Sequence, residues 1–118
     1  MSRFIDIISP IYQELLSRCE RRKITINLDI QDLTFKVRDD KVIEDFYKNE
    51  LKRALKLCKE GDKITIAQSF NSNTLRISVK NSSKTLLDNE TIEKLRSDGY
   101  EIRSRFGYDT IITQKIDQ

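Results

Sequence analysis

The stretch DDKVIEDFYKNELKRALKLCKEG, residues 39–61, predicts one complete amphipathic helix. Asp39 and Asp40 stand at its start, where carboxylates are stabilised by the positive end of the helix dipole. Apolar residues then recur at three- and four-residue spacing, which places them on one face of the helix. This face consists of Ile43, Phe46, Tyr47, Leu51, Ala54, Leu55 and Cys58. Gly61 is expected to end the helix, because glycine adopts a left-handed conformation without strain.

A second amphipathic helix is predicted closer to the N-terminus. Ser9-Pro10 is a typical helix start, since serine caps the free amides and proline at the first helical position loses no hydrogen bond. The charged run of residues 20–23 is expected to end this helix, because cations suit the negative end of its dipole. The apolar stripe between these limits consists of Ile8, Ile11, Tyr12, Leu15, Leu16 and Cys19.

Alternation of apolar and polar residues predicts six strands that pair as three hairpins. Residues 24–30 and 33–37 are expected to pair around a tight turn at Gln31-Asp32. Two further strands are expected to flank the turn-prone triplet Asn71-Ser72-Asn73, and the last two to flank Gly107-Tyr108-Asp109.

These elements predict a single domain over residues 1–118 with an α/β (α+β) architecture. A short helix from Asp88 to Leu95 is expected between the last two hairpins, with Asp88 or Asn89 as its cap. Hairpins that alternate with helices favour a two-layer sandwich, in which the helices cover one face of a mixed, mostly antiparallel sheet. A chain of 118 residues is long enough for one core and too short for two ordinary domains.

The composition is that of a globular domain with a heavily charged surface, at 37% hydrophobic and 35% charged residues. Lysine and arginine exceed aspartate and glutamate by 22 − 19 = 3, which is too balanced to predict nucleic-acid binding from charge alone. No apolar run is long enough for a membrane span or a signal peptide, so we expect a cytoplasmic protein. Cys19 and Cys58 are expected to be buried thiols rather than a disulfide.

The sequence contains no histidine. This excludes from the chain a phosphorylated histidine, a histidine general base, a Ser-His-Asp or Cys-His catalytic set, and histidine metal ligands. If the protein acts in phosphotransfer signalling, this chain cannot itself carry the phosphohistidine.

One predicted helix carries Asp39, Asn49 and Ala54 at spacings that are typical of a known family. Residues 75–81 follow as a strand, and residues 104–110 form a closing hairpin with a serine, a glycine-containing turn and a threonine. In this order the segments resemble the ATP-binding domain shared by histidine kinases, gyrase-type topoisomerases and related ATPases, the GHKL or Bergerat ATPases. The resemblance covers most of the chain and implies a histidine-kinase-like ATPase fold.

The sequence departs from this family where the family binds its nucleotide. The family's second asparagine holds the magnesium ion that neutralises the ATP phosphates, and that place is taken here by Arg53, whose permanent charge repels a cation. Asn81 replaces the aspartate that accepts a hydrogen bond from the adenine amino group, and Ser83 and Thr85 replace the glycines that follow it. Only residues 96–99 lie between Leu95 and the last hairpin, so the ATP lid is expected to be shortened.

The resemblance and these departures together imply a catalytically inactive module rather than an enzyme, with no catalytic residue, cofactor or metal. Such a module would act through protein–protein interaction in signalling or regulation, with a kinase, a response-regulator-like protein or a second copy of itself as partner. The vestigial pocket positions are Asn49, Arg53, Asn81 and Thr110. The first helix resembles the segment that leads into a kinase ATP-binding domain, and it is the expected contact element. Its candidate partner-binding residues are Ile11, Tyr12, Leu15, Arg18 and Arg22.

Two other functions fit parts of the sequence. One is a metal-independent nucleotide- or anion-binding protein in which Arg53 takes the place of magnesium. The other is a small nucleic-acid-binding module that uses interleaved aromatic and cationic residues near the C-terminus. These residues are Tyr100, Arg103, Arg105, Phe106 and Tyr108.

Each of these residues also has a plainer interpretation. Arg53 could fill the former pocket by pairing with Glu50 or Asn49. It could also lie on the solvent-exposed face of its helix, paired with a residue three positions earlier. Asn81 could be a turn residue at a strand end, and the aromatic residues near the C-terminus could belong to the core. The basic residues Arg18 and Arg22 could form a solvated helix end.

Overall fold

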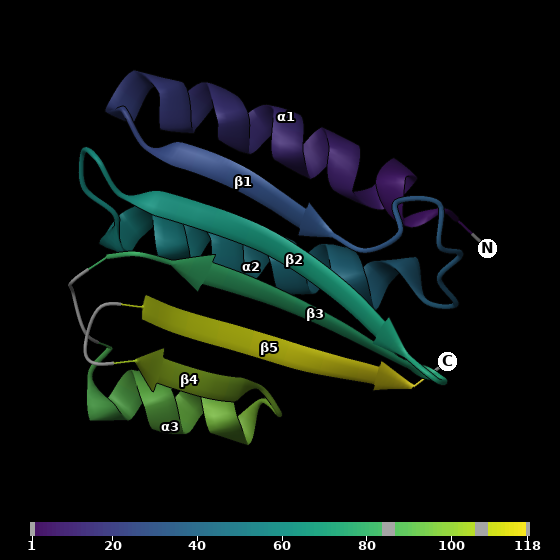
Figure 1. The fold of residues 1–118 in the computed structure, drawn as a ribbon. Helices are drawn as coiled ribbons and strands as arrows, with labels where there is room; N and C mark the ends of the chain where they lie inside the picture. Colours follow the sequence, from purple (N-terminus) through teal and green to yellow (C-terminus); the bar gives the residue numbers. More distant parts are fainter. Residues whose placement is uncertain (1, 84–86, 106–108, 118) are drawn as a thin grey trace.

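The computed structural model describes residues 2–83, 87–105 and 109–117, and it forms three helices and five strands there. The helices are α1 (Phe4–Arg22), α2 (Asp40–Leu57) and α3 (Asn89–Ser97). The strands are β1 (Thr25–Ile30), β2 (Lys63–Asn71), β3 (Thr74–Asn81), β4 (Glu101–Arg105) and β5 (Asp109–Asp117). All five strands belong to one sheet in the order β1-β2-β3-β5-β4 (Figure 1).

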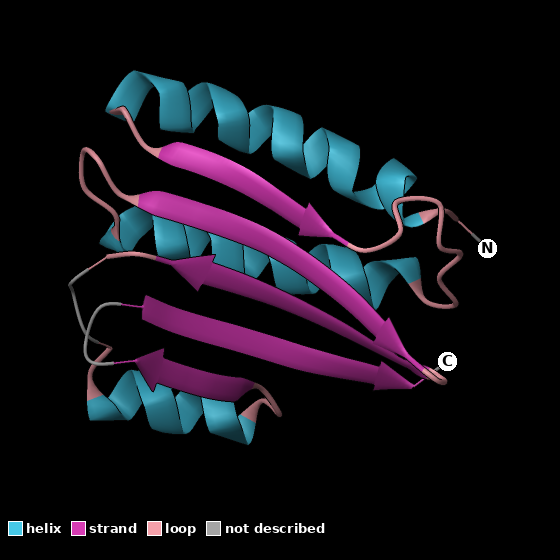
Figure 2. Cartoon of the chain, in the orientation of Figure 1, coloured by secondary structure: helices cyan, strands magenta, loops and turns pink. Residues whose placement is uncertain are grey.

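The molecule has two layers, with the helices packed on one face of the sheet. Figure 2 shows α2 behind the central strands, with α1 and α3 flanking it at the two edges of the sheet. Burial follows the same division, because β3 alternates strictly between buried and partly exposed side chains. Its buried residues are Leu75, Ile77, Val79 and Asn81. The predicted two-layer α/β sandwich is therefore confirmed.

The sheet is mixed because β1 runs parallel to β2, whereas every other neighbouring pair is antiparallel. A parallel pair needs a long crossover connection, and α2 lies within it. The predicted hairpin between residues 24–30 and 33–37 is therefore wrong. Residues 33–37 form no strand; Val37 is fully buried there, and Lys36 makes one backbone bridge with Arg3. The alternating apolar side chains of this segment pack a loop against the core.

Helix α1 begins at Phe4, so the predicted start at Ser9-Pro10 is wrong and the proline lies inside the helix. The first amides of a helix lack partners within it. Here the amides of Phe4 and Ile5 donate to the carbonyl oxygens of Phe35 and Leu33 at 2.7 and 2.8 Å. A loop distant in sequence thus caps the extra turn, which also buries the Phe4 ring completely.

Helix α1 ends at Arg22, within the predicted charged run, and this side chain joins α1 to α2. Its guanidinium donates to the carbonyl oxygens of Leu55 and Cys58, each at 2.6 Å. Lys23 then adopts a left-handed conformation with φ of 56°, which turns the chain toward β1.

Helix α2 begins as predicted, because the side chain of Asp39 caps it. The carboxylate accepts from the amides of Lys41 and Val42 at 3.1 and 3.4 Å. The helix ends at Leu57, since the next residue is already extended and buried. Gly61 therefore does not terminate the helix as predicted; it lies in the following turn with φ of +91°.

The core lies between the helices and the sheet. Tyr47 occupies its centre, with its ring edge-on to Phe4 and Phe46 at centroid distances of 6.0 and 5.2 Å. Cys19 and Cys58 are buried free thiols, as predicted. Burial raises the pKa of Cys58 to about 11, which keeps this thiol protonated at neutral pH. Within the described ranges, no helix combines the length and the apolar character that a membrane span requires.

Candidate functional site

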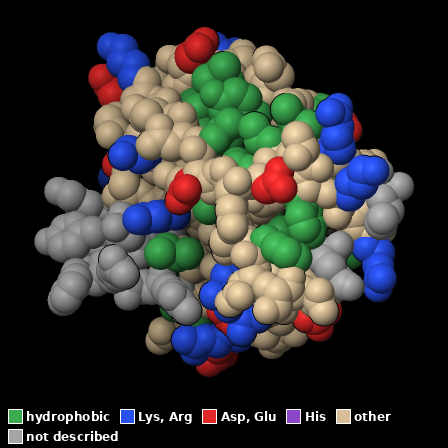
Figure 3. All heavy atoms as spheres, turned by 45° about the vertical axis from the view of Figure 1, so that its right-hand side comes forward, with side chains coloured by type: hydrophobic (Ala, Val, Ile, Leu, Met, Phe, Trp, Pro, Cys, Tyr) green, Lys and Arg blue, Asp and Glu red, His purple; other side chains and the backbone are tan. Residues whose placement is uncertain are grey.

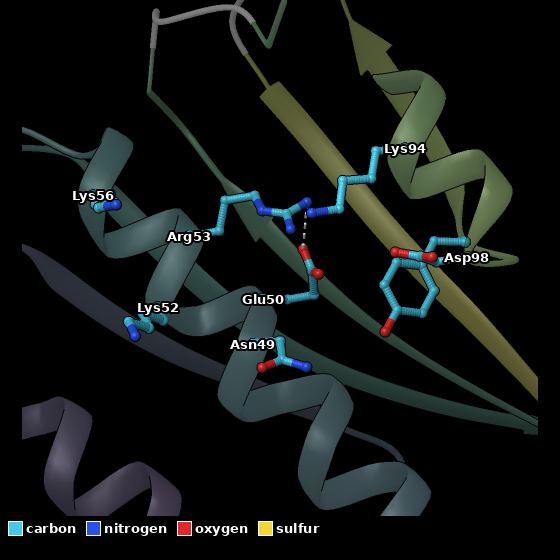
Figure 4. Close-up of a pocket in the computed structure, with 8 residues that line it drawn as sticks. Asn49, Glu50, Lys52, Arg53, Lys56, Lys94 and Asp98 are labelled. Carbon is cyan, nitrogen blue, oxygen red and sulfur yellow. Dashed lines mark ion pairs between the residues drawn. The ribbon is translucent and has the colours of Figure 1, made fainter. Parts of the chain in front are cut away.

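A cavity of about 410 Å³ lies between α2 and the segment that joins α3 to β4 (Figure 4). It contains the predicted pair Asn49 and Arg53, which lie one helical turn apart on α2. Folding brings residues of α3 and of the following segment opposite them. The lining residues are Asn49, Glu50, Lys52, Arg53, Lys56, Lys94, Asp98 and Tyr100.

Glu50 is a buried carboxylate in the wall of this cavity, with only 1% of its surface exposed. Its Oε2 atom lies 3.7 Å from Nη1 of Arg53. Among the described residues, neither carboxylate oxygen has a hydrogen-bond partner, and neither does Nη1 of Arg53. Burial raises the pKa of Glu50; Arg53 opposes this shift and Asp98 adds to it.

The Arg53 side chain is 30% exposed and pairs with Glu50 three residues earlier, as one interpretation of the sequence predicted. Its charge lies in the cavity together with those of Lys52, Lys56 and Lys94. In the described segments, no three acidic or cysteine side chains gather at a place where they could hold a metal ion. Four cations beside two carboxylates favour an anionic group over a divalent cation.

Tyr100 lines the cavity and also belongs to the core. Its ring packs edge-on against Phe46 at a centroid distance of 5.3 Å, which confirms the prediction of core packing for this residue. Burial raises the pKa of Tyr100, and the nearby charges of Glu50 and Asp98 add to the shift. Sequence reasoning did not place Lys94, Asp98 or Tyr100 at this site, because their approach to α2 depends on the packing of α3.

Asn81 and Thr110 lie opposite each other on β3 and β5, and Asn81 does not line the cavity. Asn81 is the last residue of β3 and is 4% exposed, and its Oδ1 accepts from the amide of Ser83 at 3.1 Å. The hydroxyl of Ser83 donates in turn to the carbonyl oxygen of Leu57 at 2.8 Å. The interpretation of Asn81 as a strand-end turn residue is confirmed, and the turn it begins holds β3 against the end of α2.

The connection from α3 to β4 is short. Helix α3 ends at Ser97 and β4 begins at Glu101, so Asp98, Gly99 and Tyr100 form the whole link. Three residues cannot build a glycine-rich loop followed by a helix that would receive phosphates. Thr85, Phe106 and Tyr108 lie outside the described residues, as do the side chains of Arg103, Arg105 and Thr110.

A second hollow, of about 390 Å³, lies between α1 and α2, and we call it the α1–α2 groove. Ile11 and Leu15 form part of its floor, at 8% and 6% exposure, and Arg18 lies on its rim with Glu14 3.3 Å away. Three of the five predicted partner-binding residues thus belong to the groove. It is lined by Ile11, Glu14, Leu15, Arg18, Lys48, Leu51, Lys52 and Leu55.

The other two predicted contact residues, Tyr12 and Arg22, do not line the groove. Tyr12 is half-buried and packs against the core. Arg22 uses its guanidinium to hold the end of α2, as described above, rather than to face the groove. Sequence reasoning grouped it with Arg18 because both follow the same helix, but the two side chains meet different surroundings.

Apolar side chains also reach the surface away from the groove. Leu28 on β1 and Leu33 in the following loop are the large hydrophobic residues exposed in the described part of the chain, at 43% and 38%. Figure 3 shows hydrophobic side chains gathered in patches on the face that it presents, with acidic and basic side chains between them. Single exposed apolar side chains are normal on a protein surface and by themselves mark no binding site.

No model of a known protein family matches the sequence, and no curated protein matches it significantly. Solved structures do match it. The catalytic domain of the histidine kinase ThkA superposes with a TM-score of 0.77 at 18% identity, over 95% of this chain and 90% of that one. The Acinetobacter baumannii histidine kinase AdeS superposes with a TM-score of 0.76 at 16% identity, over 98% of this chain and 65% of that one.

A further match is histidine kinase ThkA in complex with the response regulator protein TrrA, with a TM-score of 0.76 over 95% of this chain and 39% of that one. This chain therefore spans nearly all of an isolated catalytic domain and well under half of that longer chain. At these identities the likeness establishes the fold. The predicted histidine-kinase-like ATPase fold is confirmed.

Proposed function

We propose that this chain is a catalytically inactive histidine-kinase-like module that acts through protein–protein interaction in signalling or regulation and does not hydrolyse ATP. One observation carries the proposal: the ion pair between Arg53 and Glu50, 3.7 Å apart, in the wall of the cavity on α2. In the resembled family, the place of Arg53 belongs to an asparagine that holds magnesium.

The ion pair opposes binding of magnesium and ATP for electrostatic reasons. The guanidinium of Arg53 cannot donate a lone pair to a metal and repels it at close range. The buried carboxylate of Glu50 opposes the phosphates that would accompany the metal. The link of Asp98, Gly99 and Tyr100 between α3 and β4 is itself too short to enclose a triphosphate.

The composition limits the part that this chain can take in phosphotransfer. The sequence contains no histidine, so a phosphoryl group carried on histidine would have to reside elsewhere. The α1–α2 groove supports a protein partner, because an apolar floor with a charged rim is the usual anatomy of an interface. Histidine kinase ThkA, which shares the fold, has been seen with a response regulator. A response-regulator-like protein, a kinase or a second copy remains the proposed partner class.

Isothermal titration with ATP and magnesium tests the inactive site. We expect no heat of binding up to about 1 mM nucleotide, which corresponds to a binding free energy weaker than about −4 kcal/mol. An ATP-binding histidine kinase catalytic domain, titrated in the same buffer, serves as the positive control. Micromolar, magnesium-dependent binding to this chain would contradict the proposal.

A metal-independent anion-binding function is the second candidate, and the lining of the cavity favours it. Lys52, Arg53, Lys56 and Lys94 place four positive charges around one hollow. Thermal-shift assays against phosphate, nucleoside monophosphates and diphosphates without metal test this candidate. Stabilisation that persists in EDTA would support it, and the same melting temperature with and without every ligand would exclude it.

A further inference from the structure

Strand β1 has a neighbouring strand on one side only. In the described part of the chain it pairs with β2 alone and is the outermost strand of the sheet (Figure 1). The amides of Thr25 and Gln31 donate toward β2, to carbonyl oxygens 2.9 and 3.1 Å away. Backbone groups alternate in direction along a strand, so those of the residues between point away from β2 at every second position. The residues with outward backbone groups are Ile26, Leu28 and Ile30, and we call this side of the strand the β1 edge.

The sequence of the β1 edge does not discourage pairing with another strand. Natural edge strands are often interrupted by a proline, a lysine or a bulge. Strand β1 contains neither of these residues, and its register with β2 is continuous over residues 25–30. Its one charged side chain is Asp29. A regular, unpaired edge strand binds an extended segment through backbone hydrogen bonds, which is the basis of β-augmentation.

Apolar side chains are exposed beside the β1 edge, on the side that faces the helices. Leu28 lies opposite the fully buried Ile66, which places both on the helix-covered face of the sheet, yet Leu28 is 43% exposed. Leu33, at 38% exposure, lies at the start of α1, because its carbonyl oxygen accepts from the amide of Ile5 at 2.8 Å. Helix α1 therefore leaves part of this face open beyond β1.

The flank of α1 that is turned away from α2 continues this apolar surface. Helical spacing aligns Ile5, Tyr12 and Leu16 on one stripe, on the opposite side of the helix from the groove-lining Glu14 and Arg18. All three residues of the stripe are partly exposed. A strand added beside β1 would cover this flank as well as Leu28.

We propose that the β1 edge binds an extended segment of a partner protein as an added antiparallel strand. The segment exchanges backbone hydrogen bonds with Ile26, Leu28 and Ile30, and its side chains opposite these residues are apolar because they face α1. The side chain opposite Asp29 is a lysine or an arginine. Asp29 is exposed, and no ion pair in the described ranges involves it, so it is available to an opposite charge on a neighbouring strand.

A second copy of this chain fits the β1 edge less well than a single segment. Pairing of two β1 edges would place the helices of both copies on the same face of the joined sheet, because paired residues point to the same side. Helix α1 runs alongside β1 at this edge, so two α1 helices would meet where the copies join (Figure 1). An extended segment brings no helix to this place.

This inference rests on the proposed function in that the partner is a protein, and it adds the kind of segment that the partner supplies. It uses a different surface from the α1–α2 groove, on the other side of α1. The two proposals fail separately. Binding of magnesium and ATP would contradict the inactive site alone, whereas the proposal for the β1 edge is decided by a peptide.

The probe is the acetylated and amidated peptide Ser-Val-Lys-Ile-Thr-Val-Ser, whose lysine takes the place opposite Asp29. Amide hydrogen exchange of the isotope-labelled full chain is measured by nuclear magnetic resonance with and without the peptide. We expect about 1 mM peptide to slow exchange of the outward amides about tenfold, which corresponds to a dissociation constant of about 0.1 mM. These amides belong to Ile26, Leu28 and Ile30. The amides of Asn27 and Asp29, which face β2, should not change, so the alternation identifies an added strand.

Two modified peptides test the backbone hydrogen bonds. N-methylation of the central isoleucine removes a donor that faces β1 and is expected to abolish the protection. N-methylation of the threonine removes a donor that faces away from β1, and this matched control should retain the protection.

Three variants of the chain locate the binding. Leu28→Lys places a charge on the β1 edge and is expected to weaken peptide binding about tenfold or more. Ser17→Lys adds the same charge at an exposed position of α1 and should leave binding unchanged. Asp29→Lys is expected to weaken binding of the lysine peptide several-fold and to strengthen binding of a peptide with glutamate in place of the lysine.

The following results would overturn the proposal. One is unchanged exchange of all three outward amides at about 2 mM peptide. Another is equal protection by the two N-methylated peptides. Slow exchange of the outward amides in the chain alone, together with a dimer mass in light scattering, would assign the β1 edge to a second copy instead. If Leu28→Lys does not fold, the comparison of the two N-methylated peptides still decides.

Discussion

Glu50 lies on the apolar stripe of α2, four residues after Phe46 and four before Ala54. That spacing is the sequence signal that could have found it, because a charged residue at a core position of an amphipathic helix is out of place. A buried carboxylate is costly unless its surroundings neutralise it, and here Arg53, 3.7 Å away and without a hydrogen bond, offsets the cost only in part. Glu50 and Arg53 are best understood together, as a paired anion and cation in the wall of the cavity.

Glu50→Gln is predicted to make stability less dependent on pH. Burial raises the pKa of Glu50 above its ordinary value of 4.5, so the folded state holds this proton more tightly than the unfolded state does. The stability associated with the proton is complete below 4.5 and is lost as the pH rises through the folded-state pKa. Urea unfolding should therefore find the variant more stable than wild type at pH 7, with the difference shrinking toward zero under acid.

The opposite dependence of stability on pH would contradict this prediction. If Glu50→Gln were less stable than wild type at pH 7, and the loss disappeared in acid, the attraction of Arg53 would outweigh the cost of burial. Glu20→Gln, which removes the same charge at an exposed position of α1, controls for a general effect of changing the net charge.

At the scale of elements, some helix ends could be predicted from the local sequence and others could not. The start of α2 was predictable because Asp39 caps the helix with its own side chain. The start of α1 was not, since its first amides find carbonyl oxygens some thirty residues away, at Leu33 and Phe35. Residues 33–37 alternate like a strand, yet alternation alone does not distinguish a strand from a loop with buried side chains.

Arg22→Ala is predicted to lower the free energy of unfolding by about 2 to 3 kcal/mol, because hydrogen bonds from a charged donor are stronger than neutral ones. The side chain donates to the carbonyl oxygens of Leu55 and Cys58 and so joins α1 to α2. The neighbouring Arg21→Ala, at an exposed position, is the matched control and should change stability by at most about 0.5 kcal/mol. Chemical denaturation measures both, and equal losses in the two variants would show that the contact carries no stability.

At the scale of the whole molecule, the sequence predicted the layers but not the complete topology. The hairpin of β2 and β3 follows from two alternating runs and a turn between them, which are local. The parallel pairing of β1 with β2 depends on where the chain joins the sheet after α2, and no local sequence pattern encodes that position. Asn49 and Arg53 could be placed together from helical spacing, whereas Lys94, Asp98 and Tyr100 join them only after α3 packs near α2.

Nuclear magnetic resonance of the isotope-labelled chain tests the central claim, that the pair of Arg53 and Glu50 has replaced the metal-holding site. Backbone amide signals of residues 49–53 are followed during titration with ATP, first in EDTA and then with excess magnesium. The account predicts that magnesium adds no saturable shift to these signals at nucleotide concentrations up to about 1 mM. A saturable, magnesium-dependent shift centred on Asn49 and Arg53 would contradict it.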